Sequence, residues 1–279
     1  MHMPLQFNVV QKLLTFVFFL SISAIYAQAP PPVWLTLQPG EYPVAFSSFT
    51  IVDSSRSMLP YNVRPLRIFL WYPARDAADK SNNLTFGKYL ETSPEPRFSA
   101  YFDSLSTRDK STASRQFRGQ NADSLLQVLL KTTVYAQRAG EPHAGKFPLV
   151  LHSLGRNNYQ LESTVLWEYL ASHGYVVATV PQMGTSVADH RLAFTMTDML
   201  LHAEDLLFAS RYLQSKFRAE KLGLIGHSSG SIAEALAVDS FQYNALVSLD
   251  GSISTTDGNE LLNEEAFSAD KVTLPVLNL

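Results

Sequence analysis

The second half of the chain alternates short apolar segments with longer segments whose apolar residues have helical spacing. The pattern starts at Phe147 and continues to the last residue. The short segments predict strands over residues 147–151, 175–180, 222–225 and 245–249, and a last strand that begins at 274. The longer segments predict helices over residues 161–172, 197–217 and 229–238. Because strands joined through helices pair in parallel, this half predicts an α/β fold with a mostly parallel sheet and helices on both faces.

The first half has a different character. Residues 42–52 and 66–72 consist of residues that favour strands, which predicts a β-rich and antiparallel opening. Residues 75–145 are polar and show no alternation, and one helix is predicted there over residues 122–138. We interpret 75–145 as an insertion into a domain that spans 40–279, and it is either a lid or a loosely packed loop.

The N-terminal residues resemble a targeting signal. Lys12 precedes an apolar run over residues 13–25, and the small residues Ala27 and Ala29 are candidate cleavage positions, with Ala27 preferred because Pro30 follows Ala29. The alternative is a membrane anchor, but the run is shorter than the roughly 20 residues that a spanning helix needs. We therefore expect a signal peptide over residues 1–27, a proline-rich lead-in over 28–39, and an exported protein that is periplasmic or secreted.

Composition excludes several kinds of chemistry. The 279 residues contain no cysteine, which removes disulfides, thiolate metal sites and a cysteine nucleophile. The formal net charge is −3 and no basic stripe is present, so a nucleic-acid partner is not expected. No pattern indicates a metal site or a bound cofactor, and the phosphate-binding patterns G-x-G-x-x-G and the lysine-bearing loop are missing.

Residues 226–230 read Gly-His-Ser-Ser-Gly and match the pattern G-x-S-x-G. A predicted strand comes directly before this motif and a predicted helix directly after it, which is the setting of a nucleophile elbow. In such an elbow the central serine, here Ser228, stands clear of the sheet edge as a nucleophile, and the helix N-terminus favours developing negative charge. The alternative is a strand-to-helix loop of the kind found in nucleotide-binding folds. The setting favours an α/β-hydrolase fold.

Three further residues complete the predicted site. The backbone N–H groups of Ser229, directly after the nucleophile, and of Leu154, directly after a strand, are the expected oxyanion donors. Asp250 follows the strand over 245–249, so its carboxylate would reach the same sheet edge and orient an imidazolium. Its alternative is a turn aspartate, because Asp-Gly is a common turn sequence. Asp257 and Asp270 are weaker candidates for the acid, and His152 is expected to be structural.

A base for the serine is not apparent. Activation of a serine needs a base within hydrogen-bond reach, and the usual order along this fold is serine, acid, histidine. None of the seven histidines follows Asp250. We therefore expect the chain to be truncated at its C-terminus, before the catalytic histidine, and to be inactive on its own.

The chain resembles the platelet-activating factor acetylhydrolase-like family and the related dienelactone-hydrolase-like bacterial proteins. The similar segments are Arg-Pro-Leu at 64–66 with Leu-Trp-Tyr-Pro at 70–73, Phe-Pro-Leu-Val-Leu-His-Ser-Leu-Gly at 147–155, Leu-Ala-Ser-His-Gly-Tyr-Val-Val-Ala at 170–178, the elbow at 226–230, and Ser-Leu-Asp-Gly at 248–251. The family carries its acid at this last segment, one strand earlier than most α/β-hydrolases, which supports Asp250. Ser153 stands where the family often has glycine.

The resemblance implies a calcium-independent esterase without a cofactor. Its substrates would be carboxylic esters with short acyl groups, including the sn-2 acetyl group of a phospholipid. The expected partner is a small-molecule or lipid ester, and a lipid ester would also imply transient contact with a membrane surface. Two alternatives stay open, which are a hydrolase of another ester class, such as a polyester or a lactone, and a non-catalytic binding protein with the shape of a hydrolase.

Overall fold

The computed structural model describes residues 34–76, 83–91, 95–115, 117, 121–138, 140–189, 191–263 and 272–279. The predicted signal peptide over 1–27, with Ala27 and Ala29 near its end, lies outside the described residues, as does the lead-in up to residue 33. Asp270, one of the weaker acid candidates, also lies outside them. Among the helices that the described part of the chain forms, none is both long and apolar enough to span a bilayer.

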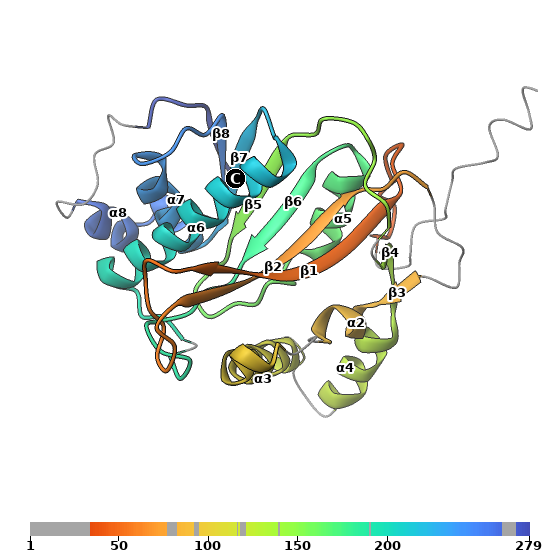
Figure 1. Ribbon diagram of the computed structural model, residues 1–279, viewed down its shortest axis with the longest axis horizontal. Helices are drawn as coiled ribbons and strands as arrows, with labels where there is room; N and C mark the ends of the chain where they lie inside the picture. The colour runs from red at the N-terminus through yellow and green to blue at the C-terminus, as the bar shows by residue number, and fades with distance from the viewer. Residues whose placement is uncertain are drawn as a thin grey trace, which may run out of the picture.

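The described residues form one sheet of nine strands in the order β3-β4-β1-β2-β6-β5-β7-β8-β9 (Figure 1). Its second half is parallel throughout, as the alternating sequence pattern predicts. The parallel strands are β5 (Leu149–Ser153), β6 (Val176–Val180), β7 (Leu222–His227), β8 (Ala245–Leu249) and β9 (Val276–Asn278). Because parallel strands end at a common edge, the loops that follow β5, β7 and β8 come together there.

The β-rich opening of the chain is antiparallel, which confirms the prediction for residues 42–52 and 66–72. Strand β1 (Val44–Asp53) pairs antiparallel with β2 (Arg64–Pro73), and β2 pairs antiparallel with β6. Every residue of β2 is buried, with alternate side chains in two different cores. Leu66, Ile68 and Leu70 face one core, whereas Phe69 and Trp71 face the other. Because successive side chains of a strand point to opposite faces, β2 contributes buried side chains to both sides of the sheet.

Helices cover both faces of the sheet, in agreement with the prediction. Helices α6 (Met196–Phe217) and α7 (Gly230–Val238) pack in one core with the even-numbered residues of β2. Helix α5 (Thr164–Ser172) lies on the opposite face of the sheet (Figure 1) and packs in the other core, where Trp167 is fully buried. A short 3₁₀ turn η4 (Ser252–Ser254) and helix α8 (Thr256–Leu262) follow β8. The α/β architecture predicted from the sequence is therefore present.

Residues 75–145 contain more structure than the sequence pattern predicts. Their elements are β3 (Asn83–Thr85), α2 (Phe86–Leu90), η3 (Pro96–Phe98), α3 (Ser99–Arg115), α4 (Ala122–Lys131) and β4 (Thr133–Arg138). The predicted helix over 122–138 is wrong beyond Lys131, where the chain becomes a strand. Thr132, Thr133 and Val134 are β-branched and favour extended backbone, and the strand pairs with both β1 and β3.

The insertion packs against the rest of the domain. Strands β3 and β4 extend the sheet at its edge beyond β1. Helix α3 places Tyr101 and Leu105 in a small core with Met58 and Met183, the last of which follows β6. Figure 1 shows α2, α3 and α4 gathered on one side of the β1–β2 pair, away from α7 and α8. The described part of the insertion is therefore folded onto the sheet, and its role as a lid stays a prediction.

Glu168 of α5 connects this insertion to the core. Its Oε1 atom accepts hydrogen bonds from the Tyr89 hydroxyl at 2.6 Å and from the backbone N–H groups of Tyr135 and Ala136, both at 3.0 Å. Its Oε2 atom accepts from Trp34 Nε1 at 3.0 Å. Trp34 belongs to the predicted lead-in, so one buried carboxylate joins α5, α2, β4 and the lead-in.

Candidate active site

The motif at residues 226–230 forms a sharp corner between β7 and α7. Strand β7 ends at His227 and α7 begins at Gly230, so the turn consists of two residues. Ser228 has a φ of 49°, in the left-handed region that residues with a side chain seldom adopt. Its backbone N–H donates to the Leu249 carbonyl oxygen at 3.0 Å, which attaches the corner to the end of β8. A serine held in strained backbone at a strand-to-helix corner is the geometry of a nucleophile elbow.

The two glycines of the motif are required by close backbone contacts. A β-carbon at Gly226 would lie 2.5 Å from the Glu234 carboxylate and 2.7 Å from the Ser231 nitrogen. A β-carbon at Gly230 would lie 2.2 Å from the Ser153 carbonyl oxygen, which belongs to the neighbouring strand. Any larger residue at either position would push α7 away from the sheet. The spacing G-x-S-x-G thus follows from how tightly the helix folds back onto β5 and β7.

The structure brings both predicted oxyanion donors to this corner. Ser229 is the N-terminal cap residue of α7 and is buried. Leu154 directly follows β5, whose residue Ser153 stands in register with Gly226. The Leu154 carbonyl oxygen would lie 2.7 Å from a β-carbon at Gly230, so the loop passes against the first residue of the helix. Their roles as oxyanion donors stay a prediction, supported by this placement.

Asp250 lies next to the elbow. Leu249 pairs with His227 across β8 and β7, so Asp250 and Ser228 occupy the next position on adjacent strands. Asp250 is exposed, has a φ of 45°, and donates its backbone N–H to the Leu279 carbonyl oxygen at 2.9 Å. Asp257 lies further along the chain, in the first turn of α8. The placement of Asp250 fits an acid that acts at the same edge as Ser228, and that role stays a prediction.

Three histidines surround the corner in different environments. His152 is buried and packs on the Trp167 ring, with 4.4 Å between ring centroids. His202 of α6 is buried with its Nε2 atom 3.0 Å from Ser153 Oγ, and burial lowers its pKa to about 4. His227 is half-buried, with its Nδ1 atom 3.1 Å from Glu162 Oε2. The surroundings of His152 fit the structural role predicted for it.

Glu162 is a residue of this site that the sequence does not reveal. Its carboxylate contacts both His227 and His152, the latter at 2.9 Å from Nε2 to Oε1. Between Leu154 and helix α5 it is the only acidic residue, and this is the one local signal that singles it out. No spacing rule connects it with the elbow, because the contact joins residues 65 positions apart.

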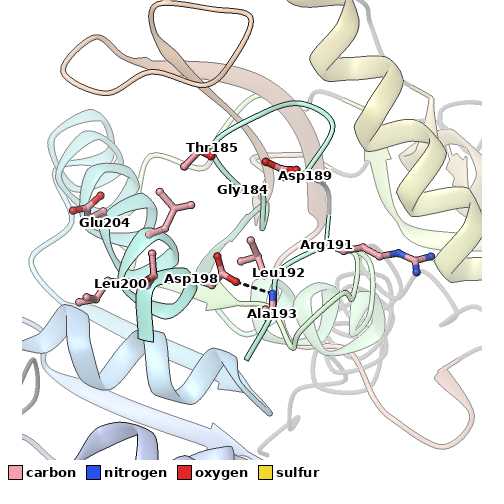
Figure 2. A pocket seen from close by; sticks show the side chains of 11 residues that line it. Gly184, Thr185, Asp189, Arg191, Leu192, Ala193, Asp198, Leu200 and Glu204 are labelled. Carbon is pink, nitrogen blue, oxygen red and sulfur yellow. Dashed lines mark hydrogen bonds between the residues drawn. The ribbon is translucent and has the colours of Figure 1, made fainter. Parts of the chain in front are cut away.

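A cavity of about 560 Å³ lies at the same edge of the sheet, beside the loop that follows β6 (Figure 2). It lies between this loop and the first turns of α6, and Figure 2 shows Arg191 extending away from it. Asp198, in the first turn of α6, accepts a hydrogen bond from the Ala193 N–H at 2.7 Å. This contact connects the preceding loop to the start of the helix. None of the described residues that line this cavity belongs to the elbow or to the Leu154 loop. In the part of the chain that the structure describes, no group of three His, Cys, Asp or Glu side chains is arranged so that it could hold a metal ion.

Solved structures show which fold this is. No family model matches the chain, and no curated protein matches it. The ferulic acid esterase from Streptomyces cinnamoneus is similar, with a TM-score of 0.51 and 21% identity over 82% of this chain and 62% of that one. The chain thus spans less than two thirds of the length of that esterase. Brefeldin A esterase, described as a bacterial homologue of human hormone-sensitive lipase, gives a TM-score of 0.43 and 12% identity over 95% of this chain and 56% of that one.

The parallel sheet, the strained Ser228 corner and the likeness to the ferulic acid esterase define an α/β-hydrolase fold. The comparisons do not identify the platelet-activating factor acetylhydrolase-like family that the sequence resembles. The comparisons therefore establish the fold of the chain. Its activity has to be inferred from the residues of the site.

Proposed function

We propose that this protein is a serine esterase that hydrolyses carboxylic esters, with Ser228 as its nucleophile. The observation that carries the proposal is the strained backbone of Ser228, held at a two-residue corner beside Leu154 and Ser229. A residue in this backbone conformation costs of order 1–3 kcal/mol of stability. Such strained residues cluster at active sites, where the strain is part of the mechanism. The likeness of the fold to a ferulic acid esterase agrees with the proposal.

The proposed reaction proceeds through an acyl-enzyme. Ser228 Oγ attacks the ester carbonyl carbon and gives its proton to an imidazole, and the N–H groups of Leu154 and Ser229 stabilise the oxyanion. The tetrahedral intermediate then collapses, the C–O bond to the alcohol breaks, and the alcohol leaves with that proton. Water attacks the acyl-enzyme by the same steps and releases the acid. Asp250 would orient the imidazole and stabilise its positive charge.

We propose that a histidine supplies this imidazole, because a serine nucleophile needs a base within hydrogen-bond reach. The three histidines around the corner are otherwise engaged, with Trp167, Ser153 and Glu162 as their neighbours.

A fluorophosphonate probe tests the nucleophile directly, applied to protein from the complete coding sequence. We expect labelling of the wild type, none in Ser228→Ala, and retained labelling in Ser229→Ala. Ser229 is a matched control, because it is the adjacent serine and its oxyanion N–H belongs to the backbone. Absence of label on Ser228 in the wild type would sink the esterase proposal and favour a non-catalytic binding protein.

The substrate class is a finer proposal. The resemblance to the acetylhydrolase-like family favours short acyl groups, including the sn-2 acetyl group of a phospholipid, and with it transient contact of an exported protein with a membrane surface. A series of esters with increasing acyl length measures this preference. A maximum kcat/KM for acetyl or propionyl esters supports the proposal, whereas preference for a lactone or a polyester assigns another ester class.

A further inference from the structure

Glu162 joins the two strand ends that carry the proposed site. Its side chain is only 4% exposed, and its Oε1 atom lies 2.9 Å from His152 Nε2 at the end of β5. Its Oε2 atom lies 3.1 Å from Nδ1 of His227, the last residue of β7 and the residue directly before the nucleophile. One carboxylate therefore bridges the strand that leads to Leu154 and the strand that leads to Ser228.

The loop after Leu154 contacts both Glu162 and His227. Glu162 Oε2 also accepts a hydrogen bond from Asn158 Nδ2, and the Asn158 backbone N–H donates to the Gly155 carbonyl oxygen at 3.0 Å. A β-carbon at Gly155 would lie 2.8 Å from His227 Nδ1, so the loop backbone lies directly against the imidazole. The position of the His227 ring thus limits where Gly155, and the Leu154 amide before it, can lie.

The charges strengthen the contact between Glu162 and His227. Burial by itself would raise the pKa of the Glu162 carboxyl, but the imidazoles of His152 and His227 outweigh burial and lower that pKa. The hydrogen bond from Glu162 raises the pKa of His227 against burial, and the charge of Asp250 raises it further. His202 of α6 also interacts with this cluster, through His152. Charge-assisted hydrogen bonds of this kind are stronger than neutral ones.

We propose that Glu162 is a positioning residue of the site, which holds His227 and the loop over 154–158 so that the Leu154 N–H faces the oxyanion formed at Ser228. This inference rests on the proposed function. The carboxylate contacts no reacting atom itself and acts through His227 and Asn158. Because the oxyanion donors must be held to a fraction of an ångström, a small movement of this loop is expected to slow acylation.

Hydrogen exchange tests the positioning independently of catalysis. We expect the backbone amides over 154–161 to exchange about tenfold faster in Glu162→Gln than in the wild type, because a charge-assisted contact is lost. We also expect the pKa of His227, followed by NMR, to fall in this variant. Glu220→Gln is the matched control, because Glu220 forms an exposed pair with Lys146 just before β7. Unchanged exchange and unchanged titration of His227 in Glu162→Gln would overturn the proposal.

Labelling kinetics connect the positioning with the reaction. In protein from the complete coding sequence, Glu162→Gln should slow fluorophosphonate labelling of Ser228 about tenfold, and Glu162→Asp, which keeps the charge, should restore part of the rate. The wild-type rate should decline as pH rises through the raised pKa of His227, where the pair loses its charge. In Glu162→Gln that decline should start at lower pH.

The outcomes separate this inference from the proposed function. A wild type that is not labelled would overturn the esterase proposal and the positioning role with it. A labelled wild type whose rate and pH profile are unchanged in Glu162→Gln would overturn the positioning role alone. If Glu162→Gln does not fold, His227→Gln tests the same link from its other end, with the same increase in exchange expected over 154–161.

Discussion

Two buried glutamates lie on opposite faces of the sheet, one in each core. They differ in the hydrogen bonds that their carboxyl groups accept. Glu168 of α5 is fully buried and accepts four hydrogen bonds, from Trp34, Tyr89 and two backbone N–H groups of β4. Glu234 of α7 is 1% exposed, and its Oε1 atom has no hydrogen-bond partner among the described residues. Burial raises the pKa of both carboxyls, but only for Glu168 do hydrogen bonds counteract it.

The difference shows that burial of a carboxyl group does not by itself indicate its effect on stability. Glu168 connects the insertion and the lead-in to the sheet, so its removal leaves several donors without partners. Glu234 of α7 lies beside Gly226, and among the described residues its Oε1 atom has no donor that would be left unsatisfied by its removal. A buried polar group without a partner costs about 1–3 kcal/mol. We therefore expect opposite signs when the two are replaced by apolar residues.

The largest effect is expected for Glu168→Leu. Two backbone N–H groups, the Trp34 indole and the Tyr89 hydroxyl would lose their acceptor inside a core, which should lower the free energy of unfolding by about 4 kcal/mol. Urea denaturation measures this loss. Glu168→Gln keeps the volume and one acceptor oxygen, so its loss should be smaller. A change below about 1 kcal/mol in Glu168→Leu would show that these hydrogen bonds do not hold the insertion.

A smaller loss is expected for Tyr89→Phe. The hydroxyl donates to Glu168 at 2.6 Å and accepts from Trp71 Nε1 at 3.2 Å, so two buried hydrogen bonds are removed while the ring stays. We expect a loss of about 2 kcal/mol, measured in the same way. Tyr212→Phe, at an exposed tyrosine, is the control and should change little. In Glu168→Leu the effect of Tyr89→Phe should shrink, because the shared hydrogen bond is already absent.

The smallest effect, and the one with opposite sign, is expected for Glu234→Met. A side chain of similar volume without a polar group should raise the free energy of unfolding at pH 7 by about 1.5 kcal/mol. Glu260→Met, on the exposed side of α8, is the control with no expected gain. A loss of stability in Glu234→Met would show that this carboxyl has a partner or a function that the described residues do not reveal.

The pH dependence of that gain sharpens the test. Because the folded-state pKa of Glu234 is raised above its usual value of 4.5, the folded protein keeps a proton that the unfolded chain loses as pH rises past that value. The unfolded state then binds fewer protons, so the wild type loses stability as pH increases. The advantage of Glu234→Met should therefore grow above pH 4.5 and shrink to a constant remainder below it, as followed by thermal unfolding across that range.

Much of the half of the fold that holds the parallel strands follows from local sequence. The strand over 245–249 is observed with the predicted bounds, and α7 starts one residue later than predicted, at Gly230. The elbow at 226–230 was predictable because its glycines and its strand-to-helix setting are adjacent in sequence. Asp250 and Leu154 were placed by the same reasoning, because each follows a strand whose end lies at the common edge.

The insertion was predicted poorly for a physical reason. Helix α3 is polar for most of its length, and its buried residues include Arg108 and Asp109, which pair with each other, so hydrophobic periodicity does not reveal it. Strand β4 follows α4 after a single residue, and its pairing with β1 and β3, which no local pattern reveals, supports its extended backbone. Glu162 was missed because its partners His152 and His227 lie on separate strands.

The sequence alone determined the parallel α/β sheet and the serine corner, because side-chain periodicity and the steric freedom of glycine act over a few neighbouring residues. Only the tertiary structure decided which distant groups meet, such as Trp34 with Glu168 or His227 with Glu162. Such contacts depend on strand order and on the path of loops, which no local pattern encodes. The same carboxyl chemistry therefore gives four hydrogen bonds at Glu168 and an oxygen without a partner among the described residues at Glu234.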